Sequence, residues 1–280
     1  MLPANGNPSS REKAQACNGR LTMSGIKRRW LGNSAANLVG GGSAAVFNLV
    51  LPSIVSRHLP AADFAAWSLA LQIVAYINLL GLGLQTATAR AIAQAEGQGD
   101  TATMQRVVRA AHSIACWAVA AAAATALLLA ICYPLLFPGI PADLLGTFRF
   151  AVLAIGLSTA SQLMAIVPMG VFQGLHRNIV YVLIQVSVRL LVVAMLWVGV
   201  HLNLQLLGLA TLLAAGSALL WPLMNNVMRT RLSWSKTVRH LPVDKAERRG
   251  LLDYCASLSV WSVATLLVNS VGVIMVGYIA

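Results

Sequence analysis

A single arginine, Arg189, lies near the middle of a long apolar stretch that runs from Asn178 to His201. At about 1.5 Å per residue, this stretch spans roughly 30 Å as a helix, which is the thickness of a bilayer core. A guanidinium at that depth is costly if it faces lipid, so we expect it to face protein or water. None of the eight acidic residues falls inside the six complete apolar stretches, which therefore offer it no carboxylate. An unpaired cation in a wet cavity indicates an anionic substrate.

Other polar side chains interrupt the apolar stretches at positions that could contact a substrate, namely Asn37, Asn48, Gln72 and Gln162. The alternative for these amides is hydrogen bonding between helices, which in membranes contributes about 0.6 kcal/mol per pair and is common. Arg57 and Arg90 lie near the ends of apolar stretches, where anchoring at the membrane surface is the usual role and a gate is the alternative. For Arg189, the alternatives are that it reaches the cytoplasmic surface or binds a backbone carbonyl.

The composition indicates an all-α integral membrane protein. The chain is 58% hydrophobic and 10% charged, with a mean hydropathy of +0.73, whereas soluble domains average about 25% charged residues. Several apolar runs exceed about 18 residues, and the alternating pattern of a membrane barrel is absent. The net charge of +12 lies between the apolar stretches, where it sets orientation in the membrane, so we expect no nucleic-acid partner.

Six complete membrane spans are predicted, and they cover residues 31–56, 65–91, 110–136, 148–172, 178–201 and 204–228. Residues 92–109 are expected to form a polar loop, and Pro222 is expected to kink the sixth span. The run from Gly40 to Gly42 indicates close approach of helices.

We predict four segments along the chain. Residues 1–22 form a polar, disordered tail, and translation is expected to begin at Met23, which N-terminal sequencing would check. Residues 23–228 form a six-span N-terminal lobe, and residues 229–250 form a basic cytoplasmic linker. Residues 251–280 begin a second lobe with a seventh, truncated span, so we expect the chain to be a fragment.

The distribution of Lys and Arg predicts a cytoplasmic N-terminus. Seventeen of the 20 basic residues lie in the N-terminal tail and in the segments after spans two, four and six, and two lie on the opposite side. Basic residues favour the cytoplasmic side of the membrane. An even number of spans before the basic segment 229–250 agrees with this orientation.

Residues with metal, redox or catalytic spacing are not found. The four cysteines contain no pair with such spacing, and the five histidines are scattered. The chain shows no cluster of His, Asp and Glu, no nucleophile with a base and no phosphate-binding glycine loop. We therefore expect no metal, no cofactor and no enzymatic activity.

The order of these features resembles the N-terminal half of a polysaccharide or oligosaccharide-lipid flippase of the multidrug/oligosaccharidyl-lipid/polysaccharide exporter superfamily. The resemblance covers most of residues 24–280 and is a diffuse pattern, carried best by Leu51-Pro52-Ser53-Ile54-Val55-Ser56-Arg57, Leu59-Pro60-Ala61-Ala62-Asp63-Phe64, Trp67-Ser68-Leu69-Ala70, Leu82-Gly83-Leu84, Ala89-Arg90 and Phe172-Gln173-Gly174-Leu175. Family members often carry an Asp where this chain has Gly81. The superfamily has two lobes of helices around a central cavity.

This resemblance implies a function in the bacterial inner membrane. It implies translocation of an undecaprenyl-diphosphate-linked oligosaccharide for surface polysaccharide synthesis, that is, O-antigen, capsule or exopolysaccharide. Arg189 is then the first candidate for the diphosphate, and Asn37, Asn48, Gln72 and Gln162 are candidates for sugar hydroxyls. The implied partners are this lipid-linked substrate, membrane lipids, and the polysaccharide polymerase and glycosyltransferases.

Two other interpretations stay open. One is a multidrug or cation antiporter of the same superfamily, which couples transport to ions through membrane-embedded carboxylates that the six complete spans lack. The other is a non-transporting fragment of a broken flippase.

Overall fold

The protein is an all-α membrane protein with several membrane-spanning helices. The computed structural model describes residues 8–61, 63–65, 67–68, 70–71, 81, 83–136, 145–236, 238, 242 and 244–258. Five helices in these ranges are long and apolar enough to cross a membrane, over Leu31–Ser56, Thr101–Cys132, Gly146–Gly174, Asn178–His201 and Leu206–Arg231. The middle of the predicted second span lies outside the described residues.

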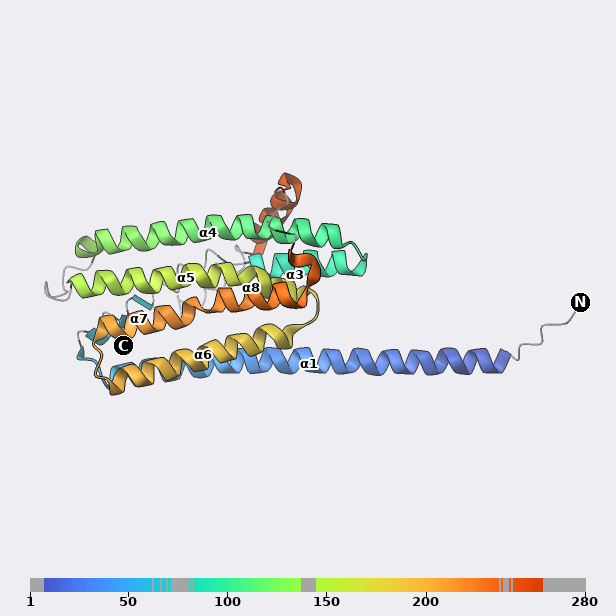
Figure 1. Ribbon diagram of the computed structural model, residues 1–280, viewed down its shortest axis with the longest axis horizontal. Coiled ribbons are helices and arrows are strands. Elements are labelled where there is room, and N and C mark those ends of the chain that lie inside the picture. The colour runs from blue at the N-terminus through green and yellow to red at the C-terminus, as the bar shows by residue number, and fades with distance from the viewer. Residues whose placement is uncertain are drawn as a thin grey trace, which may run out of the picture.

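The helices lie side by side as a bundle (Figure 1). In chain order they are α1 (Pro8–Ser56), α3 (Leu84–Gly97), α4 (Thr101–Leu136), α5 (Leu145–Gly174), α6 (Asn178–His201), α7 (Leu206–Ala218), α8 (Leu220–Arg231) and the 3₁₀ helix η2 (Ser233–Lys236). Residues 245–258 form a further helix.

Helix α5 is the centre of the bundle. It contacts α3, α4, α7 and α8, while α6 packs between α1 and α7. Over half of the most apolar part of α5, 56% of it, is buried, more than in any other of the five spans. The fully buried Phe148 and Phe172 of α5 belong to one core with Leu196 of α6 and Met224 of α8. Leu163 of α5, also fully buried, packs in a second cluster with Ala122 and Ala126 of α4.

The outer faces of the bundle are apolar. Leu49 of α1, Trp117 of α4, Leu157 of α5 and Leu190 of α6 are each more than half exposed. A soluble protein rarely exposes so many large apolar side chains, because each costs free energy in water. In a bilayer these side chains contact lipid.

Two of the predicted spans match the structure at both ends, and two other predicted segments do not match it. The first and fifth spans begin and end where predicted, at Leu31–Ser56 and Asn178–His201. The expected disordered tail is wrong for residues 8–22, because α1 already begins at Pro8. This stretch has good helix formers such as Glu12, Lys13 and Ala14.

The expected polar loop over 92–109 is also wrong, because a turn of only three residues separates α3 from α4. Met104, Val107 and Val108 of this region are buried, and so is Ala111 just after it. Their spacing is that of one face of a helix. Asp100 caps α4, because its carboxylate accepts a hydrogen bond from the Thr103 amide at 2.9 Å.

The kink expected from Pro222 is a break between α7 and α8 at Leu219. Proline has no N–H, so Pro222 cannot donate to the carbonyl of Ala218, four residues earlier. The Ser161 hydroxyl of α5 donates to that carbonyl instead, at 2.7 Å. A residue of the central helix thus satisfies the backbone group that the proline leaves free.

Candidate functional site

Arg189 is half-buried and is bound to α1. Its Nη1 donates to the carbonyl of Gly40 at 2.9 Å and to the Ser43 hydroxyl oxygen at 2.7 Å, and that hydroxyl also donates to the Gly40 carbonyl at 2.9 Å. One of the alternatives from the sequence, a backbone carbonyl partner, is therefore present. Two of the five guanidinium donors are used. The Nε and Nη2 groups have no partner among the residues that the structure describes.

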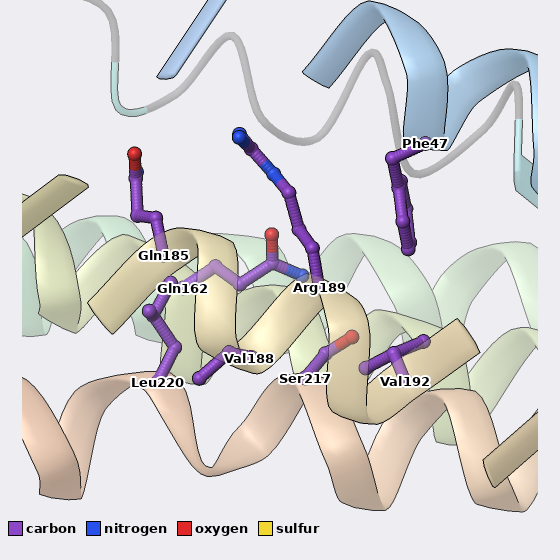
Figure 2. A pocket seen from close by; sticks show the side chains of 8 residues that line it. All are labelled: Phe47, Gln162, Gln185, Val188, Arg189, Val192, Ser217 and Leu220. Atoms are coloured by element: carbon purple, nitrogen blue, oxygen red, sulfur yellow. The ribbon is translucent and has the colours of Figure 1, made fainter. Parts of the chain in front are cut away.

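The same arginine lines a cavity of about 120 Å³ inside the bundle, drawn in Figure 2. The lining comes from five helices, α1 and α5 to α8, and consists of Phe47, Gln162, Gln185, Val188, Arg189, Val192, Ser217 and Leu220. Gln185 and Arg189 are four residues apart, so they share one face of α6 and extend from it in the same direction (Figure 2).

Two further cavities adjoin the first. One has about 240 Å³ and shares Phe47, Gln162 and Ser217 with it, and the other has about 460 Å³ and shares Gln162, Gln185 and Leu220. The side chain of Gln162 lines all three. The three adjoining cavities, called the passage below, lie between α1, α3, α5, α6 and the α7–α8 pair.

The passage contains Arg189 but no described carboxylate. Its polar lining residues are Arg189 and the uncharged Asn48, Gln85, Thr86, Ser158, Gln162, Gln185 and Ser217. The positive charge is therefore not neutralised by an acidic lining residue in the described part of the chain. A cation that keeps free donors in such a place attracts anions more strongly than it would in water.

Of the four predicted amides, the structure brings Asn48 and Gln162 to the passage. Gln162 has no hydrogen-bond partner within the described ranges, and neither has Asn48. Asn37 lies elsewhere, because its Oδ1 accepts hydrogen bonds from Asn178 at 3.2 Å and from the Tyr181 hydroxyl at 3.1 Å. Its contacts join α1 to α6. Gln72 lies outside the described residues.

Arg57 and Arg90, the two arginines predicted near the ends of spans, lie away from Arg189. Arg57 lines a separate cleft between the ends of α1 and α6. Arg90 is exposed, and its guanidinium lies 4.9 Å from the centre of the Tyr254 ring. A cation over an aromatic face in this way is a weak attraction at an exposed site.

Gln185 and Ser217 are site residues that the sequence analysis missed. Gln185 stands one helical turn before Arg189, so the spacing was available as a signal. Its Nε2 lies 3.4 Å from the sulfur of Met169, a weak acceptor. Ser217 lies in α7, one residue before the carbonyl that Ser161 binds, and no sequence pattern points to it.

The helix over residues 245–258 covers one end of the passage. Leu258 lines the largest of these three cavities, and a Cβ added to Gly83 would lie 3.1 Å from the carbonyl oxygen of Cys255 and 3.1 Å from the Cβ of Leu258. Gly83 has a φ of +81°, which only glycine adopts without strain. The positive φ and the close approach of Cys255 and Leu258 both require glycine at residue 83, where the helix over residues 245–258 meets α3.

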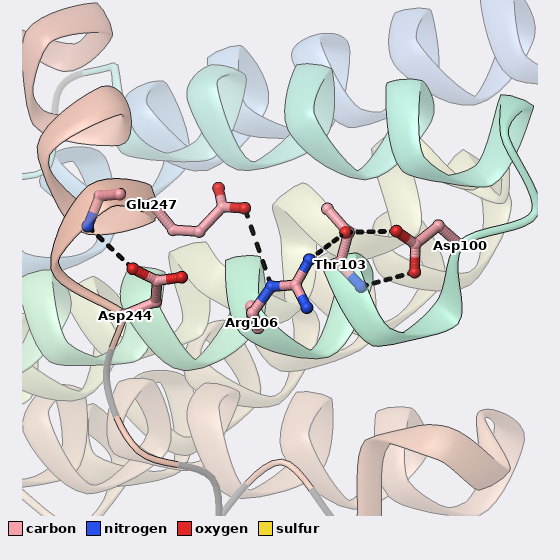
Figure 3. A network of polar contacts seen from close by, with 6 residues as sticks. Asp100, Thr103, Arg106, Asp244 and Glu247 are labelled. Atoms are coloured by element: carbon pink, nitrogen blue, oxygen red, sulfur yellow. Dashed lines mark hydrogen bonds and ion pairs between the residues drawn. The ribbon is translucent and has the colours of Figure 1, made fainter.

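Polar contacts join the start of the same helix to α4 (Figure 3). Arg106 donates to the Thr103 hydroxyl at 2.6 Å and lies 4.0 Å from Glu247. Hydrogen bonds from the hydroxyl and then the amide of Thr103 lower the pKa of Asp100. Because Arg106 and Glu247 are 43% and 31% exposed, their ion pair contributes little, about 0–1 kcal/mol.

A search of solved structures finds a match to a protein described as the outward-facing conformation of a multidrug resistance MATE family transporter of the MOP superfamily. The TM-score is 0.64 and the sequences are 18% identical. The fold resembles a MATE transporter. No protein-family model matches the chain, and a search of curated proteins finds no match.

The match covers 86% of this chain and 54% of the MATE transporter, so the chain spans about half the length of that protein. A likeness at this level of identity concerns the fold. It does not distinguish a polysaccharide flippase from a multidrug transporter.

Proposed function

We propose that this chain is part of a carrier that moves an undecaprenyl-diphosphate-linked oligosaccharide across the bacterial inner membrane for surface polysaccharide synthesis. The observation that carries the proposal is Arg189, a half-buried arginine in a membrane span that lines a passage without a described carboxylate and keeps unpaired donors. The MATE-like fold supports a transporter.

The charge and geometry of Arg189 suit a diphosphate. Moving a diphosphate past hydrocarbon requires that protein groups replace its hydration. A guanidinium does this well, because its forked N–H groups match two phosphate oxygens at once. The contacts of Nη1 with Gly40 and Ser43 hold the side chain in place, which leaves Nε and Nη2 for the ligand.

The neighbouring uncharged groups suit a sugar. Gln162, Gln185 and Ser217 line the same cavity as Arg189, and each can donate to and accept from sugar hydroxyls. The polyprenyl tail needs no polar contact and can remain in the bilayer, beside the apolar outer faces of the helices. The partners of this carrier would be the enzymes that make and polymerise the oligosaccharide.

A multidrug or cation antiporter is the second candidate, and the MATE-like fold favours it. Ion coupling in such a protein would use a carboxylate in or beside the membrane. Among the described residues, the Asp63 side chain, which follows the end of α1 in the chain, has one buried oxygen without a hydrogen-bond partner. Asp63 is therefore the residue to test for coupling.

The experiment compares variants at Arg189 in cells that depend on this protein for surface polysaccharide. Arg189→Gln removes the charge, and Arg189→Lys keeps the charge but loses the paired N–H groups that bind two phosphate oxygens at once. We expect both to lower polysaccharide export at least tenfold, with unchanged protein in the membrane. Arg149→Gln, at an exposed cation of α5, is the matched control and should export normally.

Ser43→Ala separates substrate binding from helix packing. This change removes one anchor of Arg189 and leaves its Nε and Nη2 donors in place, so we expect export to fall by less than about threefold, the effect of one weak membrane hydrogen bond. Normal export from Arg189→Gln would contradict the proposal. Altered drug resistance in Asp63→Asn without loss of polysaccharide would favour the antiporter.

A further inference from the structure

Helices α1 and α6 finish at the same end of the bundle (Figure 1), and a further cleft lies between their ends. It has a volume of about 470 Å³, and its lining includes Leu49, Ile54, Arg57, His58, Trp197 and His201. His201 follows Arg189 by 12 residues, which along a helix is about 18 Å. This cleft is therefore separate from the passage around Arg189.

Basic side chains gather at the mouth of this cleft. Arg57 is exposed, and it lines the cleft together with its chain neighbour His58 and with His201. The Nδ1 of His201 lies 2.9 Å from the carbonyl oxygen of Trp197. A carbonyl only accepts, so Nδ1 carries the proton and Nε2 can donate only when the ring is charged. No Asp or Glu is among the described lining residues, so an anion fits this mouth.

The walls of the cleft are apolar and open toward the bilayer. Leu49 is 72% exposed and Trp197 is 56% exposed. The Trp197 and His201 rings lie 4.0 Å apart between centres and make the rim. Tryptophan at the end of a membrane span lies at the depth of lipid headgroups. The basic mouth is thus at headgroup depth, and the apolar walls run along the acyl chains.

We propose that this cleft binds an anionic phospholipid of the bilayer, with the phosphate at Arg57 and His201 and an acyl chain along Leu49 and Ile54. The charge selects an anionic headgroup over a zwitterionic one. The apolar walls select a lipid over a soluble phosphate. This inference does not depend on which substrate the carrier moves.

Native mass spectrometry of the full chain in detergent tests the proposal. Phosphatidylglycerol, phosphatidylcholine and inorganic phosphate are each titrated against the wild type. We expect tight binding of one phosphatidylglycerol, at least tenfold weaker binding of phosphatidylcholine, and no retained inorganic phosphate. Retention of inorganic phosphate, or equal binding of both lipids, would overturn the assignment of an anionic lipid.

Two variants locate the site. Arg57→Gln and His201→Gln should each weaken phosphatidylglycerol binding, by roughly fivefold for the arginine, since a basic residue near anionic lipid contributes about 1 kcal/mol. Arg149→Gln, an exposed cation that does not line the cleft, is the control and should bind as the wild type does. Circular dichroism without lipid checks that all variants fold. Unchanged binding in folded Arg57→Gln would place the lipid elsewhere.

Discussion

Ser161 shows how one side chain can decide the shape of a neighbouring helix. Pro222 leaves the Ala218 carbonyl without its helical donor, and Ser161 supplies the missing hydrogen bond from α5. The break at Leu219 lies beside Ser217, which lines the central passage. The residue pair therefore fixes both the bend and the position of a candidate site residue.

We expect Ser161→Ala to destabilise the protein by about 1 kcal/mol, because it leaves a carbonyl inside the bundle without a donor. In a Pro222→Ala background the same change should cost less than about half of that, since residue 222 then has its own N–H to donate. Thermal unfolding in detergent of the four chains of this double-mutant cycle measures the difference. Equal costs in both backgrounds would show that Ser161 does not serve the proline break.

At the level of elements, close packing of backbones joins α5 to α3. A Cβ added to Gly170 would lie 2.7 Å from the carbonyl oxygen of Gln85 and 2.9 Å from the Cβ of Thr88. One added to Gly174 would lie 2.5 Å from the carbonyl oxygen of Ala89. These two glycines are four residues apart on one face, the spacing by which membrane helices approach closely. The sequence also predicts close packing at residues 40–42. Among the described residues, only Gly40 of this run lies close to α6, because a Cβ added to Gly41 or Gly42 would meet no atom within 4 Å.

Gly170→Ala should therefore force α3 and α5 apart and destabilise the protein by about 1–3 kcal/mol, the usual cost of overpacking. Gly146→Ala in the same helix is the matched control, because a Cβ there meets no atom within 4 Å. It should be neutral or slightly stabilising, since alanine favours helix over glycine. Thermal midpoints in detergent compare the two. A Gly170→Ala chain as stable as Gly146→Ala would mean that the helices are not in contact there.

On the scale of the whole molecule, the two ends of the bundle differ in charge. The α3–α4 turn, the α5–α6 turn and the end of α8 lie at one end, where Figure 1 also places the helix over residues 245–258. The end of α1 and the α6–α7 turn lie at the other end (Figure 1). Seventeen of the 20 basic residues belong to the first side, which predicts that this side faces the cytoplasm.

Cysteine labelling tests this orientation. In a chain whose four cysteines are replaced by serine, a single cysteine is placed at Gln98 or at Asn203, in turns at opposite ends of the bundle. A membrane-impermeant maleimide should label residue 203 in spheroplasts and residue 98 only after the membrane is opened. The reverse pattern would contradict the predicted orientation.

The amino-acid sequence by itself determined the membrane class and the ends of several spans. Apolar length is a local property, because a bilayer of fixed thickness requires about 20 apolar residues whatever the neighbouring helices are. The positions of Leu31–Ser56 and Asn178–His201 followed from that rule alone. Arg189 was found in the same way, since a charge at that depth needs an explanation wherever its helix packs.

Only the tertiary structure decided which polar residues meet. Gln162 and Arg189 line one cavity, whereas Asn37 binds α6. The spacing of these residues in the chain does not predict which of them line the cavity. Their positions depend on how helices that are distant in sequence face one another. The short α3–α4 turn was missed because its flanking helices are amphipathic and bury only one face against α5 and each other. Ser161 and Gly170 have roles that exist only through contacts with another helix. Apolar length places a helix in the membrane, but side-chain contacts across helices decide its rotation and its partners.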